Sequence, residues 1–297
     1  MLKHNRALLN NFRYFIQTEK GLSKNTIVSY VSDIESFLVF CNKSFNNVSN
    51  SDFVDFFVSL QKIGVSSNSL SRKKSSIKSF ITFLLEEGLK LTIELEKLPQ
   101  IKHSKNLPLA LSTYEMKKML EFYQKPDALS VRNRAILEFM YATGTRVSEV
   151  INLSEHDIYW DDKLIRVLGK GSKQRYVPIL ETSISYLKNY IQSSRAKLLK
   201  TGQTDILFLN RFGRKLSRMG MWKIIEKAAR ESFIKKEVSP HTIRHTFATH
   251  LLEGGANLRV IQILLGHTSI NTTQIYTNID TKYIVSVHKK YHPRARR

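Results

Sequence analysis

The sequence has 297 residues, enough for two domains of ordinary size, and its hydrophobic content of 42% is sufficient for packed cores. Its apolar runs are shorter than the roughly 20 residues that cross a bilayer, and its single cysteine excludes an intramolecular disulfide and a cysteine-based metal cage. We therefore expect a cytoplasmic protein with no membrane span, and the opening MLKHNRALLNNF also lacks the apolar core of a signal peptide.

The charge balance is strongly basic. Lys and Arg number 47 against 25 Asp and Glu, which gives a formal net charge of +22. Residues 1–106 hold 15 basic and 9 acidic side chains, so the remainder holds 32 and 16, and both parts are basic. Such a field attracts polyanions, of which nucleic acid is the commonest large one; a merely solvated basic surface or a ribosome-associated protein is the alternative.

The first hundred residues predict helices only. Apolar residues recur at helical spacing over 6–19, 24–41, 52–63 and 69–88, and Ser23 is a good N-cap for the second of these helices. The fourth of these segments stops at Gly88.

The fourth predicted helix has two different faces. Its apolar stripe consists of Ile77, Phe80, Ile81 and Leu84, while its first half is polar and cationic. A small, polar, cationic helix face suits a groove of DNA, although an ordinary exposed face is as good an explanation for it alone. The candidate DNA-contacting residues here and at the start of the second helix are Lys24, Asn25, Arg72, Lys73, Lys74 and Lys78.

A linker follows. The stretch PQIKHSKNLPLALST, residues 99–113, has two prolines, two lysines and no apolar period. We expect a first domain at 1–98, a linker at 99–111 and a second domain at 112–297. The second domain reads as mostly helical, with two short strands around a Gly-Lys-Gly turn within 163–179.

The most unusual stretch is SPHTIRHTFATH, residues 239–250. Ser239 followed by Pro240 is a strong helix start, and it places His241 in a first turn where free N–H groups favour an anion. Arg244 lies three residues further along the same face. His241 and His245 also have the spacing of a helical zinc motif, but the stretch has no carboxylate and carries a cation between the two histidines, so an oxyanion site is favoured. His245 and His250 are expected to make local hydrogen bonds in the packed helix.

Further residues of the same chemical kind lie elsewhere in the second domain. In FMYATGTRVSEVINL a helix is expected to end at Gly144 and another to begin with Thr145 as N-cap, which leaves Arg146 on a sharp corner within reach of Glu149. Lys170 lies on the predicted hairpin turn. Taken alone, each of these residues reads as an ordinary surface residue.

The last motif is LLGHTSINTTQIYT, residues 264–277. Gly266 is expected to end a helix, His267 lies at the break, and a further short helix carries Tyr276. A single tyrosine among 12 is ordinarily a packing or surface residue, so only the combination of motifs gives Tyr276 significance.

Together, in this order, the motifs resemble the tyrosine recombinase (phage integrase) family, and specifically its Xer branch, over essentially the whole chain. The stretches ATGTRVSE, HTIRHTFATHLL, LLGH and TTQIYT carry the resemblance, and the closing HPRARR is similar to Xer tails. Asn278 departs from the histidine of many relatives. The family's ordered catalytic set of Arg, Lys, His-x-x-Arg, His or Trp, and Tyr corresponds to Arg146, Lys170, His241, Arg244, His267 and Tyr276.

The resemblance implies a fold and a mechanism. The fold would be mainly α with a small β-sheet: a four-helix SAM-like core-binding domain, then a helical catalytic domain that ends in an exchange helix. Tyr276 would attack a scissile phosphodiester to give a 3′-phosphotyrosyl enzyme, with the two arginines on the phosphate and Lys170 as the acid for the leaving 5′-oxygen. His241 would assist the proton transfer from Tyr276, and His267 would donate a hydrogen bond. Neither metal nor cofactor is expected.

The resemblance also implies partners. These are two double-stranded DNA sites; either a homo-tetramer or a hetero-tetramer with a paralogous Xer recombinase on that DNA; and an FtsK-type DNA translocase. The C-terminal helix, with an apolar stripe of Tyr283, Val287 and Tyr291, would pack on a neighbouring protomer. The implied role is the resolution of chromosome dimers at dif-like sites during segregation. Alternatives are an integrase or transposase of a mobile element, a type IB-like topoisomerase, or a DNA-binding protein without catalytic activity.

Overall fold

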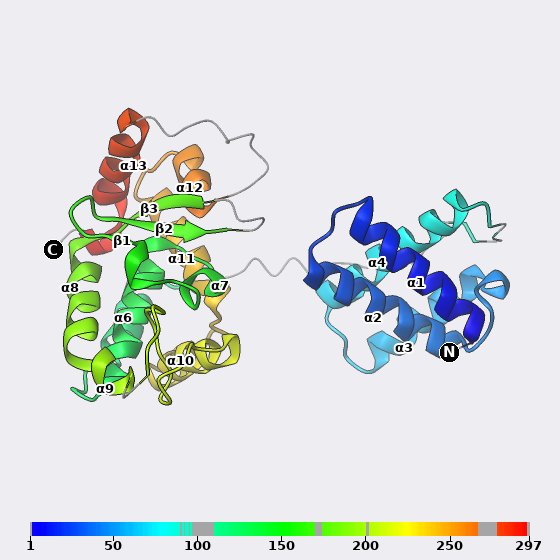
Figure 1. Ribbon diagram of the computed structural model, residues 1–297, viewed down its shortest axis with the longest axis horizontal. Helices are drawn as coiled ribbons and strands as arrows, with labels where there is room; N and C mark the ends of the chain where they lie inside the picture. Colours follow the sequence, from blue (N-terminus) through cyan, green and yellow to red (C-terminus); the bar gives the residue numbers. More distant parts are fainter. Residues whose placement is uncertain are drawn as a thin grey trace. The chain divides into compact units, whose positions relative to one another are not determined.

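A computed structural model describes residues 2–89, 91, 93–94, 96, 110–169, 174–199, 202–266 and 278–295. The chain divides into two compact units, Met1–Asn106 and Leu107–Arg297 (Figure 1). Both are predominantly helical, and within the described ranges no helix is long and apolar enough to span a membrane. The predicted class, mainly α with a small β-sheet, is confirmed.

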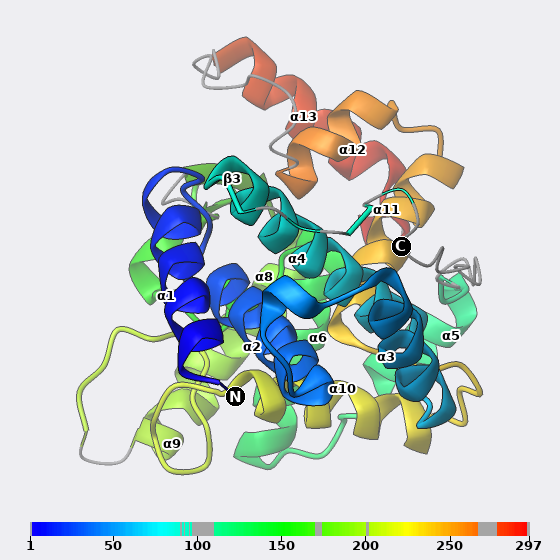
Figure 2. The same ribbon diagram turned by 90° about the vertical axis from the view of Figure 1, so that its right-hand side faces the viewer.

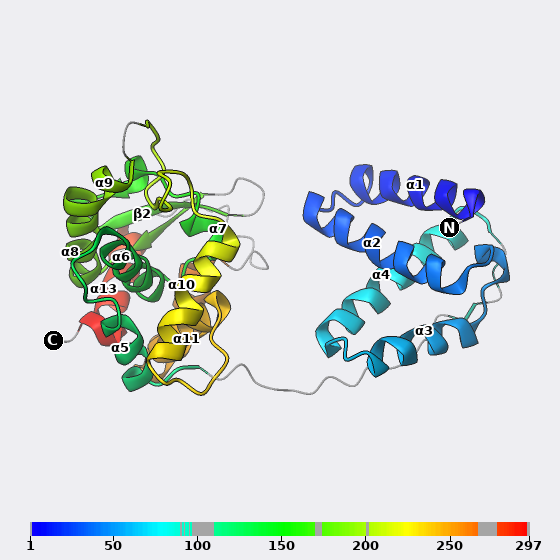
Figure 3. The same cartoon turned by 90° about the horizontal axis from the view of Figure 1, so that it is seen from below.

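The described residues of the first unit form four α-helices and a short 3-10 turn at Phe45–Asn47. The helix α2 packs against both α1 and α4 (Figure 3). Phe37 and Phe53 stack at 4.5 Å between ring centroids inside the bundle, and Ser23 caps α2 as expected by accepting a hydrogen bond from the Thr26 N–H. The helices are α1 (Lys3–Thr18), α2 (Lys24–Cys41), α3 (Asn50–Lys62) and α4 (Ser67–Glu86).

The predicted apolar stripe of the fourth helix is confirmed, because Ile77, Phe80, Ile81 and Leu84 are all buried in the core of this unit. Burial of large aliphatic and aromatic side chains removes them from water and stabilises the bundle by about 1.5–3 kcal/mol per side chain. The polar first half of α4 is mixed: Arg72 is exposed, Lys73 and Lys74 are half-buried, and Ser76 is buried.

The second unit is built around α6 (Ala128–Thr143), whose residues 132–143 are all buried. Figure 1 shows α6 flanked by α8 and α11, and both pairs are in contact. The remaining helices are α5 (Thr113–Glu121), α7 (Val147–Val150), α8 (Glu181–Asn189), which continues through a π-helical segment (Tyr190–Arg195) into α9 (Ala196–Leu199), then α10 (Arg218–Glu231), α11 (Pro240–Glu253), α12 (Leu258–Leu265) and α13 (Asn278–Tyr291); 3-10 turns lie at Glu155–Asp157 and Pro293–Ala295.

A three-stranded antiparallel sheet interrupts the helices, in the order β1 (Ile158–Tyr159), β2 (Leu164–Leu168) and β3 (Gln174–Pro178). The predicted hairpin therefore forms, and its register pairs Leu164 with Pro178 and Leu168 with Gln174. Side chains alternate along β3, so Arg175 and Val177 face the interior while Gln174 and Tyr176 are exposed. An arginine on the inward face is the unusual feature of this sheet.

The C-terminal helix α13 packs on its own unit, against α11, α12 and β3; Figure 2 shows it beside α12 and α11. Val287 and His288 are buried there, Tyr291 is half-buried and Tyr283 is 58% exposed. Of the expected stripe, Val287 and part of Tyr291 are therefore covered by the protein's own second unit, while Tyr283 is not. The packing of this helix on a neighbouring protomer stays a prediction. Leu111, expected at the end of the linker, is a buried core residue of the second unit, while residues 99–109 lie outside the described ranges.

Candidate active site

Arg244 lies on the inner side of α11. As expected, Ser239 caps this helix by accepting a hydrogen bond from the Thr242 N–H, and Pro240 occupies the first helical position. Arg244 follows in the next turn and is only 9% exposed. Its Nη1 donates to the Gly144 carbonyl and its Nη2 to the Leu265 carbonyl, each at 2.6 Å. These two bonds use two of the five N–H groups of the guanidinium and fix its plane.

Gly144 forms the corner that receives Arg244. It ends α6 with a positive φ of +57°, and its N–H donates to the Met140 carbonyl. A Cβ atom at this position would lie 2.4 Å from Cδ1 of Phe247, so only glycine lets α11 approach this closely. The helix end predicted at Gly144 is confirmed.

Arg146 comes two residues after this corner. The expectation that Thr145 caps the next helix is wrong: Thr145 is buried, its hydroxyl lies 2.9 Å from that of Thr143, and Arg146 itself is the N-cap of α7. The Arg146 N–H donates to Oε2 of Glu149 at 2.7 Å, and its Nη1 to Oε1 at 3.1 Å. Glu149 therefore holds both the main chain and the side chain of Arg146, as expected, while 38% of that side chain stays exposed.

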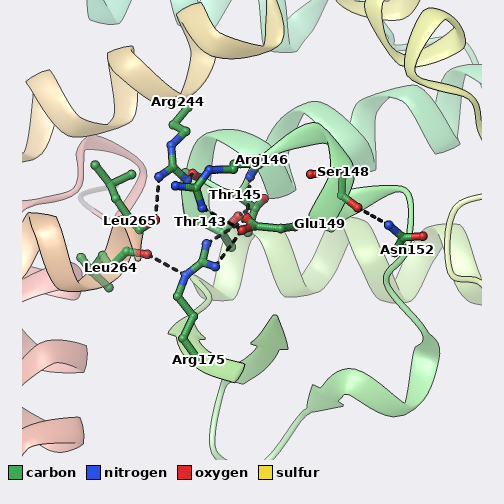
Figure 4. Close-up of polar contacts among 11 residues, drawn as sticks. Thr143, Thr145, Arg146, Ser148, Glu149, Asn152, Arg175, Arg244, Leu264 and Leu265 are labelled. Atoms are coloured by element: carbon green, nitrogen blue, oxygen red, sulfur yellow. Dashed lines mark hydrogen bonds and ion pairs between the residues drawn. The ribbon is translucent and has the colours of Figure 1, made fainter. Parts of the chain in front are cut away.

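A third arginine, which the motifs did not indicate, completes the cluster. Arg175 on β3 donates from Nη1 and Nη2 to the two carboxylate oxygens of Glu149 at 2.8 and 2.9 Å, and from Nε to the Leu264 carbonyl at 3.2 Å. Figure 4 shows the Arg175 guanidinium on one side of Glu149, with those of Arg146 and Arg244 side by side on the other. The available signal was the inward position of an arginine in a strand, since a buried charge needs a partner.

The cluster has excess positive charge. Burial, followed by the neighbouring charges of Arg146 and Arg175, lowers the pKa of Arg244 to about 10 against the opposing effect of Glu149. Burial acts to raise the pKa of Glu149, but the hydrogen bonds and charges of Arg175 and Arg146 outweigh it, so that pKa lies below its usual value. At neutral pH three guanidinium groups thus face one carboxylate. A partly open site with two uncompensated positive charges is suited to bind an anion.

The histidines of the crowded helix have different surroundings. His241 is exposed in the first turn of α11, beside Arg244 in sequence, and His245 is half-buried. The prediction for His250 is confirmed, because its ring nitrogens lie 2.8 Å from the Tyr141 hydroxyl and 2.9 Å from the Leu111 carbonyl. Within the described ranges no group of three or more His, Cys, Asp or Glu side chains is arranged to hold a metal.

The other three expected site residues, Lys170, His267 and Tyr276, lie outside the described residues. Their flanking segments are described: β3 begins four residues after Lys170, and Gly266 directly precedes His267. Gly266 ends α12 as expected, with a positive φ of +65°. Arg175 lies on β3 itself, and its Nε donates a hydrogen bond to the carbonyl of Leu264, two residues before Gly266.

The candidate DNA-contacting residues of the first unit fall into two groups. Lys24, Asn25 and Lys78 are exposed, and Lys74 is half-buried. Arg72 and Lys73 instead bind the two oxygens of Asp33, a carboxylate that is only 2% exposed, and the Lys73 contact measures 3.1 Å. The charge of this part of α4 is therefore partly compensated within the protein.

The fold of the described chain is that of DNA-bound integrases and recombinases. It is similar, with a TM-score of 0.70 and 23% identity, to the XerH site-specific recombinase bound to its palindromic difH substrate, over 94% of this chain and 83% of that one. It is also similar to the Tn1549 transposon integrase in complex with circular intermediate DNA, with a TM-score of 0.68 and 19% identity, over 93% of this chain and 98% of that one.

Sequence comparison gives the family. Residues 110–282 match the phage integrase family and residues 9–88 match the phage integrase N-terminal SAM-like domain. The tyrosine recombinase XerD of Chlorobaculum tepidum is 42% identical over 98% of this chain and 97% of its own, and that of Oceanobacillus iheyensis is 40% identical over 97% and 98%. The chain belongs to the phage integrase family, the tyrosine recombinases, and its activity is that of a site-specific DNA recombinase.

Proposed function

We propose that this recombinase cleaves and rejoins DNA through a 3′-phosphotyrosyl intermediate formed on Tyr276, and that it resolves chromosome dimers at dif-like sites. The observation that supports this most directly is the pairing of Arg146 and Arg244 around the Gly144 corner. Two guanidinium groups fixed by carbonyl and carboxylate partners match the two non-bridging oxygens of a phosphodiester. The family membership and the XerD relatives support the Xer role over that of a mobile-element integrase.

The chemistry follows from charge. The Tyr276 oxygen attacks phosphorus and the bond to the 5′-oxygen breaks, so the phosphate keeps its bond to the 3′-oxygen of the DNA and is newly joined to Tyr276. The tyrosine proton passes to His241, and Lys170 gives a proton to the leaving 5′-oxygen. Negative charge that develops on the phosphate in the transition state is stabilised by Arg146 and Arg244, which are already oriented before the reaction.

The covalent intermediate conserves the energy of the phosphodiester bond that was cleaved. A phosphotyrosyl ester replaces a phosphodiester of similar energy, so the 5′-hydroxyl of another strand reverses the same steps without ATP. Exchange of strands between two sites then requires several subunits, and we propose a tetramer on two DNA sites, with a paralogous recombinase or an FtsK-type translocase as further partners. His267 would donate a hydrogen bond to the same phosphate.

The test is a covalent trap. A duplex carrying a dif-like site, nicked so that the cleaved end is lost, accumulates the protein–DNA adduct. We expect an adduct with the wild type that disappears in Tyr276→Phe and persists in the matched control Tyr114→Phe, since Tyr114 is an exposed residue of α5. An adduct that survives in Tyr276→Phe would place the nucleophile elsewhere. Adduct formation on scrambled DNA at an equal rate would contradict the site-specific Xer role.

A further inference from the structure

Arg175 is the one member of the arginine cluster to which no role in the reaction has been given. It is 8% exposed and lies on β3, five positions after Lys170. Both oxygens of Glu149 accept from it, at 2.8 and 2.9 Å. Burying a charged group is costly unless it is paired, so the inward position of Arg175 depends on its pairing with Glu149.

The contacts of this side chain join three segments. The first is the hairpin that carries Lys170, the second is the corner of Arg146 and Glu149, and the third is the end of α12, through the Leu264 carbonyl at 3.2 Å. A Cβ atom on Gly266 would lie 2.9 Å from Cδ of Arg175, so the aliphatic stem of the arginine also packs directly against the residue that precedes His267. One side chain therefore fixes the spacing of the three segments that bear proposed site residues.

The charges give Arg175 a second effect. Glu149 is shared between Arg146, at 3.1 Å, and Arg175, at 2.8 Å, through the same Oε1. With Arg175 present the carboxylate is already neutralised, and Arg146 remains available to an incoming phosphate. Without Arg175 the carboxylate would be free to pair fully with Arg146 and so compete with the phosphate for the same guanidinium.

We propose that Arg175 is a positioning residue for strand cleavage, which neutralises Glu149 and thereby keeps Arg146 directed at the scissile phosphate. The inference rests on the proposed function, because it assigns Arg146 to that phosphate. It makes a prediction that a purely structural role does not make. Removal of the Glu149 charge should compensate for the loss of Arg175.

The experiment measures single-turnover adduct formation on the nicked duplex at saturating protein, with thermal unfolding and duplex affinity determined in parallel. Arg175→Met is expected to slow the adduct step by about 100-fold, the loss typical of a misplaced reacting group, with duplex affinity within about threefold of the wild type. Adding Glu149→Gln to Arg175→Met is expected to recover at least tenfold. Arg166→Gln is the matched control, since Arg166 on the adjacent strand pairs with Asp157 and lies apart from the cluster.

A structural role would give a different pattern. If the double variant is as slow as Arg175→Met, or slower, and unfolds at a lower temperature, the charge-neutralising role is overturned. If Arg175→Met does not fold, Arg175→Lys keeps the charge without the two-pronged contact. A rate for Arg175→Lys within about tenfold of the wild type supports the proposal, because the charge that neutralises Glu149 is kept; a folded Arg175→Lys protein that is slowed by about 100-fold overturns it. Absence of the adduct in the wild type would instead overturn the proposed function itself.

Discussion

The main-chain carbonyl of Gly144 accepts a 2.6 Å hydrogen bond from Nη1 of Arg244, although the two residues are 100 positions apart in sequence. The bond is made where α6 ends and α11 passes, and it requires that α11 approach the corner without a side chain between them. Phe247, one turn after Arg244, fills the space that a Cβ on residue 144 would occupy. Site geometry and core packing are thus linked through a single glycine.

Gly144→Ala should strongly destabilise the second unit. The left-handed backbone costs an alanine about 1–2 kcal/mol, and the overlap with Phe247 adds about 1–3 kcal/mol, so we expect a loss of about 2–5 kcal/mol in the free energy of unfolding. Gly21→Ala is the matched control, because its φ of +56° is nearly the same but no atom lies within 4 Å of the added Cβ. Denaturant unfolding of both variants measures the difference, and equal losses would show that the Phe247 contact is unimportant.

Arg244→Lys should slow strand cleavage. A lysine keeps the charge, but its single ammonium cannot hold the Gly144 and Leu265 carbonyls and also contact a phosphate in a fixed geometry. We expect adduct formation to fall by about 100- to 1000-fold, the usual effect of losing one preorganised donor. Arg259→Lys, on the exposed face of α12, serves as control. A rate for Arg244→Lys within about threefold of the wild type would exclude Arg244 from the transition state.

Acid should destabilise the second unit because two histidines of the C-terminal segment are held neutral. His288 and His292 are fully buried, and their Nε2 atoms lie 2.7 and 3.1 Å from the carbonyls of Ala142 and Tyr141. Burial lowers the pKa of His288 to about 4; burial, and then the neighbouring His288, also lower the pKa of His292 well below its usual value.

The sign of the pH effect follows from these shifts. The unfolded chain binds protons on both histidines below about pH 6.5 while the folded chain does not, so stability is full above that pH and falls as the pH decreases towards 4. Between pH 7 and 5 we expect a loss of about 2 kcal/mol per histidine. Thermal unfolding across this range measures the slope, which His288→Gln should reduce and His156→Ala, at an exposed site, should leave unchanged. A flat profile in the wild type would contradict the buried neutral state.

Two lysines of α4 should respond differently to the same substitution. Lys78 is exposed, so Lys78→Ala should weaken DNA binding and reduce the slope of log affinity against log salt by about one. Lys73 is bound to the buried Asp33, so Lys73→Ala should lower the free energy of unfolding of the first unit by about 1–3 kcal/mol. Affinity measured over a salt series, with unfolding curves for both, separates the two effects. An unchanged salt slope for Lys78→Ala would remove this face from the DNA contact.

Local chemistry in the sequence determined much of this protein. Capping by Ser23 and by Ser239 with Pro240, helix ends at Gly144 and Gly266, and the apolar stripe of α4 depend on residues within one or two turns of each other, which is why spacing alone predicted them. The motifs also placed Arg146 next to Glu149, since both lie on one short helix start.

Other features were decided only by tertiary structure. The bond of Arg175 to the Leu264 carbonyl joins residues 89 positions apart, and Arg72 binds Asp33 across 39. Which charges pair depends on the arrangement of whole helices and strands. In surroundings of low dielectric constant, a buried ion pairs with the opposite charge that lies nearest in space, wherever that partner is in the sequence. Alternation along the strand places Arg175 on the same side as Val177, but only the folded chain shows that this side is interior and that Glu149 lies there to pair with Arg175.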